Sequence, residues 1–470
     1  MKVLMFGWEF PPHISGGLGT ACFGLTQSLV KQNVKVLFVV PRLYGDETAE
    51  GSVLINASAV RKKRKSTKPP AWYSATASTE SWNAEQSASI RRSRMTIIEI
   101  PAGFSPYDLP ADRPFTSESK TISLWNYSMS PERILPAPLA SDTDHSRKAS
   151  GSEIDNDHYL FSGSYGPNLL DEIHRYGEIG GILAGEYSFD VIHVHDWMTF
   201  EAGIRAKKVS KKPLVIHVHS TEVDRAGENI NKNVFELEKK GLMEADRIIT
   251  VSNWTKQIVT TRYKIPPEKI KVVHNGVLPK EEPSGFPFPE IGSHFITFLG
   301  RVTHQKGPAF FVAAAYKVLQ EFPDAHFIVA GAGDLLPQII LMVAQFNMSS
   351  NFHFTGFLSG CEVDQIWSMT DVYVMPSVSE PFGIAPLEAI QGGVPVILSN
   401  QSGVSEVMPH AIKVDFWDVK ALAGAICSVL QYESLSHVLR QHSKRHIQHL
   451  TWNKAASDVK ALYHELTGKK

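Results

Sequence analysis

The 470-residue chain has few cysteines, no long apolar run and no excess of either charge. Its three cysteines, Cys22, Cys361 and Cys427, are odd in number and lack metal-site spacing, which indicates a reducing compartment without a disulfide framework. No run of about 18 apolar residues is present, so the sequence predicts no membrane-spanning helix. The net charge of −1 gives no reason to expect nucleic acid as a partner.

The first residues also lack the pattern of a signal peptide. The apolar stretch at 1–6 is short and is followed by Gly7 and the acidic Glu9, which predicts a first strand. We therefore expect a cytoplasmic protein. With 43% hydrophobic and 20% charged residues, a chain of this length is too long for one core and predicts a soluble enzyme of two or three domains.

Strand-like and helix-like segments alternate along the chain, which is typical of parallel α/β sheets. A first series of predicted strands occupies 3–6, 35–40, 191–194, 214–218, 247–251 and 270–273. A linker at 279–287, rich in proline and charge, separates it from a second series at 295–299, 326–330, 352–355, 372–375 and 394–398. The sequence thus predicts two Rossmann-like domains facing across a cleft, at 1–280 and 281–452.

Residues 48–150 interrupt this alternation with stretches rich in Ser, Thr and Pro and a basic cluster at 61–65. The apolar run at 95–100 still has the pattern of a strand. We interpret the segment as an insertion that elaborates the N-terminal domain with solvated loops. The alternative is that the basic cluster contacts an anionic membrane surface or polymer.

The most informative stretch, 379–389, contains two glutamates eight positions apart, Glu380 and Glu388. A buried-strand pattern precedes it and an apolar helical pattern follows, with Glu388 expected about two turns into the helix. Ligands of open parallel sheets bind at such strand ends, where backbone N–H groups at the helix start face an anion. Gly383 permits close backbone approach, so the two carboxylates are placed to bind hydroxyls at both ends of a nucleotide sugar.

The phrase Glu-Pro-Phe-Gly at 380–383, followed by Glu388 and Ala389, resembles the donor-site signature of retaining two-domain (GT-B) glycosyltransferases, the group that includes glycogen synthases. The resemblance implies a catalytic role for Glu380, which would bind the donor sugar. It also implies donor contacts from four further residues: Phe382, Gly383, Ile384 and Glu388.

A second loop, from Gly300 to Gly307, follows the first predicted strand of the second domain. Arg301 offers a planar fork for phosphate oxygens and Lys306 a compact charge, so together they could neutralise a leaving diphosphate. The loop matches the family's Gly-Arg-x4-Lys-Gly, which implies catalytic roles for both cations.

Three glycines resemble the family's donor loops: Gly16 and Gly17 after the first strand, and Gly333 at the end of a second-domain strand. Synthases that use ADP-glucose often carry a lysine ahead of the first pair. This chain has residues 13–15, His-Ile-Ser, there instead, which argues against ADP-glucose as donor. The segment from Thr451 also resembles the family, and implies that a C-terminal helix at 453–470 crosses back to the first domain.

Two histidine pairs, His193 with His195 and His217 with His219, place each pair on one face of a predicted strand. A metal site is one alternative, but Thr221 and Glu222 stand where a metallohydrolase phrase needs Asp and His, so we predict no metal. The family resemblance implies that His195 and Asp196 lie near the acceptor and that His219 is a catalytic residue near the donor sugar. His193 and His217 are expected to be packed and hydrogen-bonded inside the sheet.

Taken together, the resemblance implies hexosyl transfer from a nucleotide sugar to an oligosaccharide or polysaccharide, with retention and without cofactor or metal. The start of the chain at 7–12 and the phrase His195-Asp196-Trp197 are most similar to glycogen synthases, which implies a glucose donor and an α-1,4-glucan acceptor. Two alternatives stay open. One is a glycosyltransferase for a lipid-linked or capsular glycan. The other, of a different class, is a nucleotide-sugar epimerase or hydrolase.

Overall fold

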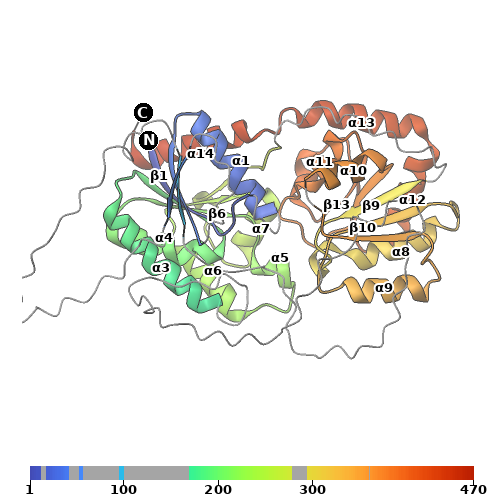
Figure 1. Ribbon diagram of the computed structural model, residues 1–470, viewed down its shortest axis with the longest axis horizontal. Coiled ribbons are helices and arrows are strands. Elements are labelled where there is room, and N and C mark those ends of the chain that lie inside the picture. The colour runs from blue at the N-terminus through green and yellow to red at the C-terminus, as the bar shows by residue number, and fades with distance from the viewer. Residues whose placement is uncertain are drawn as a thin grey trace, which may run out of the picture.

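The computed structural model describes residues 1–11, 17–41, 169–277, 294–358 and 360–469, together with the backbone of 52–56 and 95–99. Two parallel sheets, each covered by helices, form two α/β domains that lie side by side (Figure 1). The first sheet takes its strands from residues 2–272 and the second from residues 295–414. Within the described segments, no helix has the length and apolar character that a membrane span requires.

The N-terminal sheet has eight strands in the order β3-β4-β2-β1-β5-β6-β7-β8, and all neighbours are parallel. Helices cover both faces, so central strands such as β5 are buried over their whole length. The strands are β1 (Lys2–Phe6), β2 (Lys35–Val40), β3 (Ser52–Asn56), β4 (Met95–Glu99), β5 (Val191–His195), β6 (Leu214–Val218), β7 (Arg247–Thr250) and β8 (Ile270–Val272).

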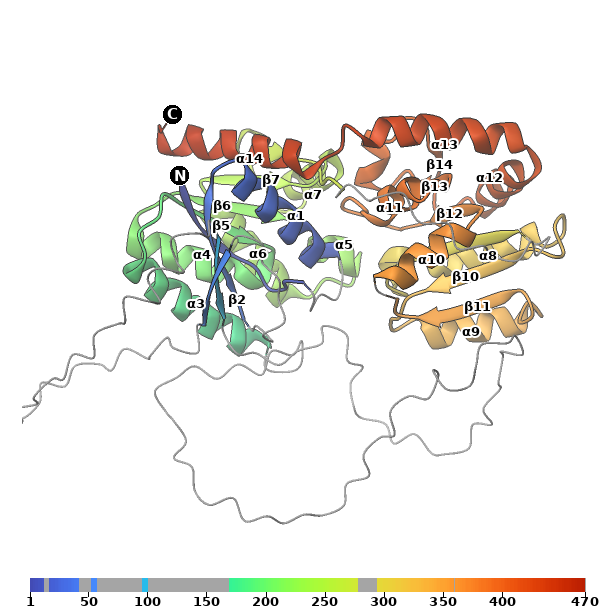
Figure 2. The same ribbon diagram turned by 45° about the horizontal axis from the view of Figure 1, so that its top comes forward.

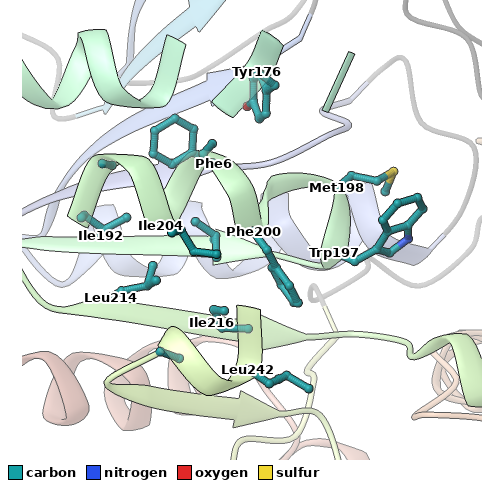
Figure 3. Packing of buried hydrophobic residues seen from close by; sticks show 14 of the residues in the cluster. Phe6, Tyr176, Ile192, Trp197, Met198, Phe200, Ile204, Leu214, Ile216 and Leu242 are labelled. Atoms are coloured by element: carbon teal, nitrogen blue, oxygen red, sulfur yellow. The ribbon is translucent and has the colours of Figure 1, made fainter. Parts of the chain in front are cut away.

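Besides the C-terminal helix α14 (Trp452–Thr467), described below, several helices of the first domain cover this sheet. They are α1 (Gly17–Lys31), α3 (Leu169–Glu186), α4 (Trp197–Ser210), α5 (Glu222–Ala226), α6 (Lys232–Glu244), α7 (Asn253–Thr261) and the short 3₁₀ helix η4 (Pro267–Lys269). Figure 3 shows the core under α3, α4 and α6, where Phe6, Ile192, Leu214 and Ile216 of the sheet meet Phe200, Ile204 and Leu242 of the helices. The Tyr176 hydroxyl lies 2.9 Å from the carbonyl oxygens of Gly7 and Val39, so it joins α3 to the ends of β1 and β2.

The C-terminal sheet has six parallel strands in the order β11-β10-β9-β12-β13-β14. They are β9 (Phe295–Leu299), β10 (His326–Ala330), β11 (Phe352–Gly356), β12 (Val372–Met375), β13 (Val396–Ser399) and β14 (Ile412–Val414). The helices are η5 (His304–Lys306), α8 (Pro308–Val318), α9 (Leu336–Gln345), α10 (Cys361–Met369), α11 (Ala385–Gln391), η6 (Gly403–Val407), α12 (Val419–Gln431) and α13 (Glu433–Ile447).

The chain returns to the first domain at its C-terminus. Helix α13 lies along the C-terminal domain, and α14 (Trp452–Thr467) lies beside α1 on the N-terminal domain, as both views show (Figures 1 and 2). Trp452 and Tyr463 of α14 are buried in the core under α1. The return lies directly against the forward crossing, because the N–H of Val277 donates to the Leu450 carbonyl at 3.0 Å.

The strands on either side of the chain's main change of winding direction are β1 and β5 in the first sheet and β9 and β12 in the second. The carboxyl ends of strands at such a point form the usual ligand site of an open α/β sheet. In the first domain these ends lead into Gly7 and Asp196, and in the second into Gly300 and Pro376. The sheet topology therefore predicts a ligand site at the same loops that carry the candidate residues found in the sequence.

The predicted two-sheet architecture is confirmed, and the ends of the predicted strands differ from the structure by at most two residues. The strand expected near 95–100 is present as β4, whereas the edge strands β3 and β14 were not predicted. Several predictions concern segments outside the described residues: the linker at 279–287, the basic cluster at 61–65, the rest of the insertion, residues 12–16 with the donor-site Gly16, and Lys470.

Candidate active site

Arg301 and Lys306 lie on the loop between β9 and α8, which includes the 3₁₀ helix η5. One Arg301 guanidinium N–H donates to Gln305 Oε1 at 3.1 Å. Gly307 ends the loop with φ 66°, and a Cβ there would lie 2.0 Å from the Pro376 carbonyl oxygen. Only glycine fits this close approach, which holds the Lys306 loop against the end of β12.

Glu380 lies on the loop after β12 and is only 5% exposed. Its carboxylate forms an ion pair with the Lys306 ammonium and accepts a weaker hydrogen bond from Ser377 Oγ at 3.4 Å. Its backbone N–H donates to Gln401 O at 2.9 Å, and its carbonyl accepts from the N–H of Gly403 at 2.8 Å. The structure therefore brings together the predicted leaving-group cation and the predicted sugar-binding carboxylate.

The remaining donor-loop residues follow Glu380 in a tight turn. Phe382 is buried at 2% exposure, and Gly383 has φ 96°, a conformation that favours glycine. The turn occupies residues 381–384, so α11 begins only at Ala385 and Glu388 lies in its first turn. The prediction that Glu388 lies about two turns into the helix is therefore wrong, and Glu388 lies closer to the loop than expected.

Gly17 is the first residue of α1 and faces the donor loop of the other domain. A Cβ on Gly17 would lie 3.8 Å from Ile384 Cδ1, and Ile384 packs against the core under α1. Gly333 lies next to the Arg301 loop, because a Cβ there would be 2.3 Å from the Val302 carbonyl oxygen. Both glycines thus lie beside the loops that carry the predicted donor residues.

The four histidines His193, His195, His217 and His219, called the histidine cluster below, share the face of the N-terminal sheet that α1 and α14 cover. Neighbouring rings are stacked, with centroids 4.5 Å apart for His193 and His195 and 4.3 Å for His217 and His219. His195 Nδ1 lies 2.9 Å from His219 Nε2, so one of the two nitrogens donates to the other. The predicted acceptor-side and donor-side histidines are therefore bonded to each other.

The inner histidines differ in how their nitrogens are satisfied. His193 Nδ1 is hydrogen-bonded to the Tyr463 hydroxyl, as expected for a packed histidine. In the described part of the chain neither nitrogen of His217 has a hydrogen-bond partner, so the expectation that it is hydrogen-bonded is wrong. Burial lowers the pKa of all four imidazoles, to about 3 for His193 and His219. The cluster is therefore neutral.

Asp196 follows β5 in a strained conformation, φ 57° and ψ 167°, which is rare for a residue with a side chain. Its Oδ1 accepts from the backbone N–H of His219 at 2.7 Å and more weakly from that of Ser220 at 3.3 Å. Burial raises its pKa to about 7, against the opposing effect of these hydrogen bonds. Asp196 thus holds the carboxyl end of β6 in place.

The predicted acceptor residues are buried, with His195 at 0% and Asp196 at 5% exposure. Both side chains contact His219, through the His195 imidazole and through the Asp196 carboxylate, and so help to position that residue. His219 itself is partly buried.

Three family models match successive parts of the chain: the starch synthase catalytic domain at residues 2–121, Glycosyltransferase Family 4 at 153–281 and Glycosyl transferases group 1 at 287–446. An uncharacterised glycosyltransferase of Methanocaldococcus jannaschii is 31% identical over 302 residues, which cover 60% of this chain and 77% of that protein. Glycogen synthase of Mycobacterium tuberculosis is 27% identical over 248 residues, 51% of this chain and 60% of that enzyme's length. The chain belongs to the glycogen synthase-like GT-B glycosyltransferases.

This glycosyltransferase is a hexosyltransferase enzyme. Its fold matches that of a sucrose-phosphate synthase from Thermosynechococcus elongatus, with a TM-score of 0.66 at 16% identity over the whole of both chains. It also matches Anabaena HepE in complex with UDP and glucose, with a TM-score of 0.59 at 13% identity over 99% of this chain and all of that one. At these identities the likeness establishes the fold alone.

Among the residues of the glycosyltransferase that the structure describes, two groups bring metal-binding atoms within 4.8 Å of one another: Cys22 with His195 and His219, and His193 with His195 and His217. The neutral imidazoles have the protonation state that a metal needs. However, the near-parallel stacking of His193 on His195, at 17°, directs their lone pairs side by side rather than toward one point. The absence of a metal requirement stays a prediction.

Sequence reasoning missed a set of residues in the glycosyltransferase that join the two domains around Glu380. Ser379 is hydrogen-bonded to Asp224 and Trp254 of the N-terminal domain. Glu406 accepts from the N–H groups of Asn253 and Trp254 at the start of α7. The Thr221-x-x-Asp224 spacing is a capping-box signal and could have identified the start of α5, but nothing local to it indicates a contact with residue 379.

Proposed function

We propose that the enzyme transfers glucose from a nucleoside-diphosphate donor to an α-1,4-glucan with retention at the anomeric carbon. The observation that carries the proposal is the contact between Lys306 and Glu380 at the switch point of the second sheet, opposite the start of α1. A cation that can bind a diphosphate lies there next to a carboxylate that can bind sugar hydroxyls. A nucleotide sugar likewise carries its sugar next to its diphosphate.

Lys306 and Arg301 stabilise the departing diphosphate in this proposal. Negative charge grows on the diphosphate in the transition state, and fixed cations close to it act more strongly than in water. Lys306 already pairs with the buried Glu380, so it has little freedom to move away from the site. The diphosphate replaces this carboxylate as the lysine's partner when the donor binds, which frees Glu380 to accept from the sugar.

Glu388 binds the ribose hydroxyls at the other end of the donor. Its place in the first turn of α11 leaves a short distance to the Glu380 loop. Burial raises the pKa of Tyr373 most, and the charges of Glu380 and Glu388 raise it further. Both acids are therefore close enough to act on one buried tyrosine of β12.

The acceptor hydroxyl attacks from the side that the diphosphate leaves and passes its proton to the departing phosphate. His219 is neutral in this scheme, because burial lowers its pKa to about 3. It therefore acts as a hydrogen-bonding group near the sugar. The hydrogen bond between His195 and His219 and the Asp196 contact with the His219 backbone orient it.

The relatives support this choice of donor and acceptor. Glycogen synthase of Mycobacterium tuberculosis is among the relatives, and the Anabaena HepE structure contains UDP and glucose. UDP-glucose is therefore the first donor to test. The alternatives of a lipid-linked or capsular acceptor, and of an epimerase or hydrolase, predict different requirements for the acceptor.

The test is a panel of UDP-, ADP- and GDP-sugars, each with and without glycogen, with release of the nucleoside diphosphate as readout. The proposal expects glycogen-dependent release from a glucose donor and a new α-linkage in the proton NMR spectrum of the product. Lys306→Ala should reduce release by about a hundredfold or more, whereas Lys317→Ala, at an exposed lysine on α8, is the matched control. Equal release without glycogen would favour the hydrolase or epimerase, and a β-linkage would exclude retention.

A further inference from the structure

The hydroxyl of Ser379, the residue before Glu380, lies between two groups of the other domain. It donates to Asp224 Oδ1 at 2.6 Å and accepts from the indole N–H of Trp254 at 3.2 Å. These partners are 155 and 125 positions away in the sequence. One serine hydroxyl on the donor loop thus has both its donor and its acceptor function satisfied by the N-terminal domain.

The two partners are themselves held firmly. Asp224 is 2% exposed, and its second oxygen accepts from Thr221 N–H at 2.9 Å and Thr221 Oγ1 at 2.7 Å in the capping box of α5. Trp254 lies in the first turn of α7, where its backbone N–H donates to Glu406 Oε1 at 2.6 Å. A buried carboxylate and an anchored indole leave Ser379 little positional freedom.

The residue after Glu380 is tied to the same domain. The Pro381 carbonyl accepts from Ser252 Oγ at 2.5 Å and from Thr255 Oγ1 at 3.3 Å. Helix α5 also contacts η5, the segment that ends at Lys306. Both neighbours of the sugar-binding carboxylate are therefore fixed by the first domain, although Glu380 belongs to the second.

We propose that Ser379 is a positioning residue for sugar transfer, which sets the Glu380 loop through its contact with the N-terminal domain. Its hydroxyl does not touch the donor in this scheme; it acts through Glu380. The kinetic part of this inference rests on the proposed function. It predicts that loss of the hydroxyl reduces turnover and leaves nucleotide binding intact, because Arg301, Lys306 and Glu388 all lie within the second domain.

The kinetic test compares Ser379→Ala, which removes both hydrogen bonds, with Ser379→Thr, which keeps a hydroxyl. Ser428→Ala is the matched control, because that exposed hydroxyl donates to Gly424 O within its own helix α12. Loss of a bond to a buried charged group predicts a fall in kcat of about tenfold to a hundredfold for Ser379→Ala. We expect UDP binding by calorimetry to change by less than about twofold. Ser379→Thr should recover most of the rate.

A double-mutant cycle then asks whether Trp254 acts through the same hydroxyl. Trp254→Phe removes the indole N–H and leaves the Asp224 cap of α5 untouched. If Trp254 and Ser379 act through one shared contact, Trp254→Phe lowers kcat in the wild-type enzyme. In the Ser379→Ala enzyme it then lowers kcat little further. Independent, additive losses would show that Trp254 and Ser379 act separately and would overturn the inference.

A second readout does not depend on activity. Amide hydrogen exchange of peptides covering residues 376–384 should be faster in Ser379→Ala than in the wild type or Ser428→Ala, because the loop has lost its contact with the N-terminal domain. Unchanged exchange, or wild-type kcat in Ser379→Ala, refutes the positioning role. If the wild-type enzyme transfers no sugar from any donor, the proposed function fails. The exchange result then decides separately whether Ser379 fixes the loop to the first domain.

Discussion

The histidine cluster should make the N-terminal domain sensitive to acid. Burial lowers the pKa of His193 and His219 from 6.5 to about 3, so both stay neutral in the folded protein. In the unfolded chain they take up protons below about pH 6.5. The stability that depends on their neutrality is therefore present above pH 6.5 and is lost as the pH falls. At pH 5 the loss is roughly 2 kcal/mol for each of these two histidines.

The other two histidines of the cluster and the neighbouring Asp196 change this loss of stability in known directions. Burial also lowers the pKa of His195 and His217, which adds to the loss. Asp196 opposes it, because its pKa is raised to about 7 and the folded protein binds this proton before the unfolded chain does. Between pH 7 and 5 that gain is about 2 kcal/mol, close to the contribution of one histidine. His193 and His219 together lose about 4 kcal/mol by pH 5, so the net effect with Asp196 is a loss of about 2 kcal/mol, to which His195 and His217 add, against a typical stability of about 5–15 kcal/mol.

Hydrogen exchange under native conditions at about pH 7.5, 6 and 5, corrected for the intrinsic exchange rates, would measure this effect for each domain. We expect protection of β5 and β6 to fall with pH faster than protection of β12 and β13, which serve as an internal reference. His217→Leu is the informative variant, because its imidazole has no hydrogen-bond partner among the described residues and leaves none unsatisfied. This variant should take up one proton fewer on unfolding, so protection of β5 and β6 should depend less on pH. Constant or rising protection of β5 and β6 toward pH 5 would refute the reasoning.

Three further predictions concern catalysis. Arg301→Ala and Lys306→Ala should each reduce transfer by about a hundredfold or more, because each removes a charge that faces the departing diphosphate; near-normal turnover in both would exclude that role. Activity should survive EDTA, and loss on chelation with recovery by one divalent ion would instead implicate the metal-binding atoms of Cys22, His195 and His219. Glu380→Ala should lower kcat and Glu388→Ala should raise the donor KM, each about ten- to a hundredfold. Steady-state kinetics, together with calorimetry of nucleoside-diphosphate binding, measures both effects. Wild-type kinetics in both variants would remove the donor-site assignment.

Much of the fold was predictable because each strand of a parallel sheet is a short apolar run, and such runs are visible in the sequence without knowledge of their neighbours. The edge strands β3 and β14 were missed since they lack that signal or lie in a polar insertion. The position of Glu388 was wrong for a local reason. Pro381 and the positive φ of Gly383 extend the turn, so α11 starts later than the apolar pattern suggests.

The candidate site was only partly predictable. Motif spacing selected Lys306 and Glu380 separately, but their ion pair joins residues 74 positions apart and depends on how β9 and β12 lie together. The bond between His195 and His219 likewise depends on the pairing of β5 with β6. Contacts between the domains, such as that of Ser379 with Asp224, have no local pattern at all.

The Lys306–Glu380 pair connects the two halves of the proposed chemistry. A buried carboxylate that loses its cation is costly unless another partner replaces it. A diphosphate that takes Lys306 away therefore leaves Glu380 in need of a hydrogen-bond donor, and the hydroxyls of the donor sugar are the groups that arrive with it. A nucleoside diphosphate alone supplies no such hydroxyl at this position. The exchange of partners thus favours an intact nucleotide sugar over its product, which would assist release of the diphosphate after transfer.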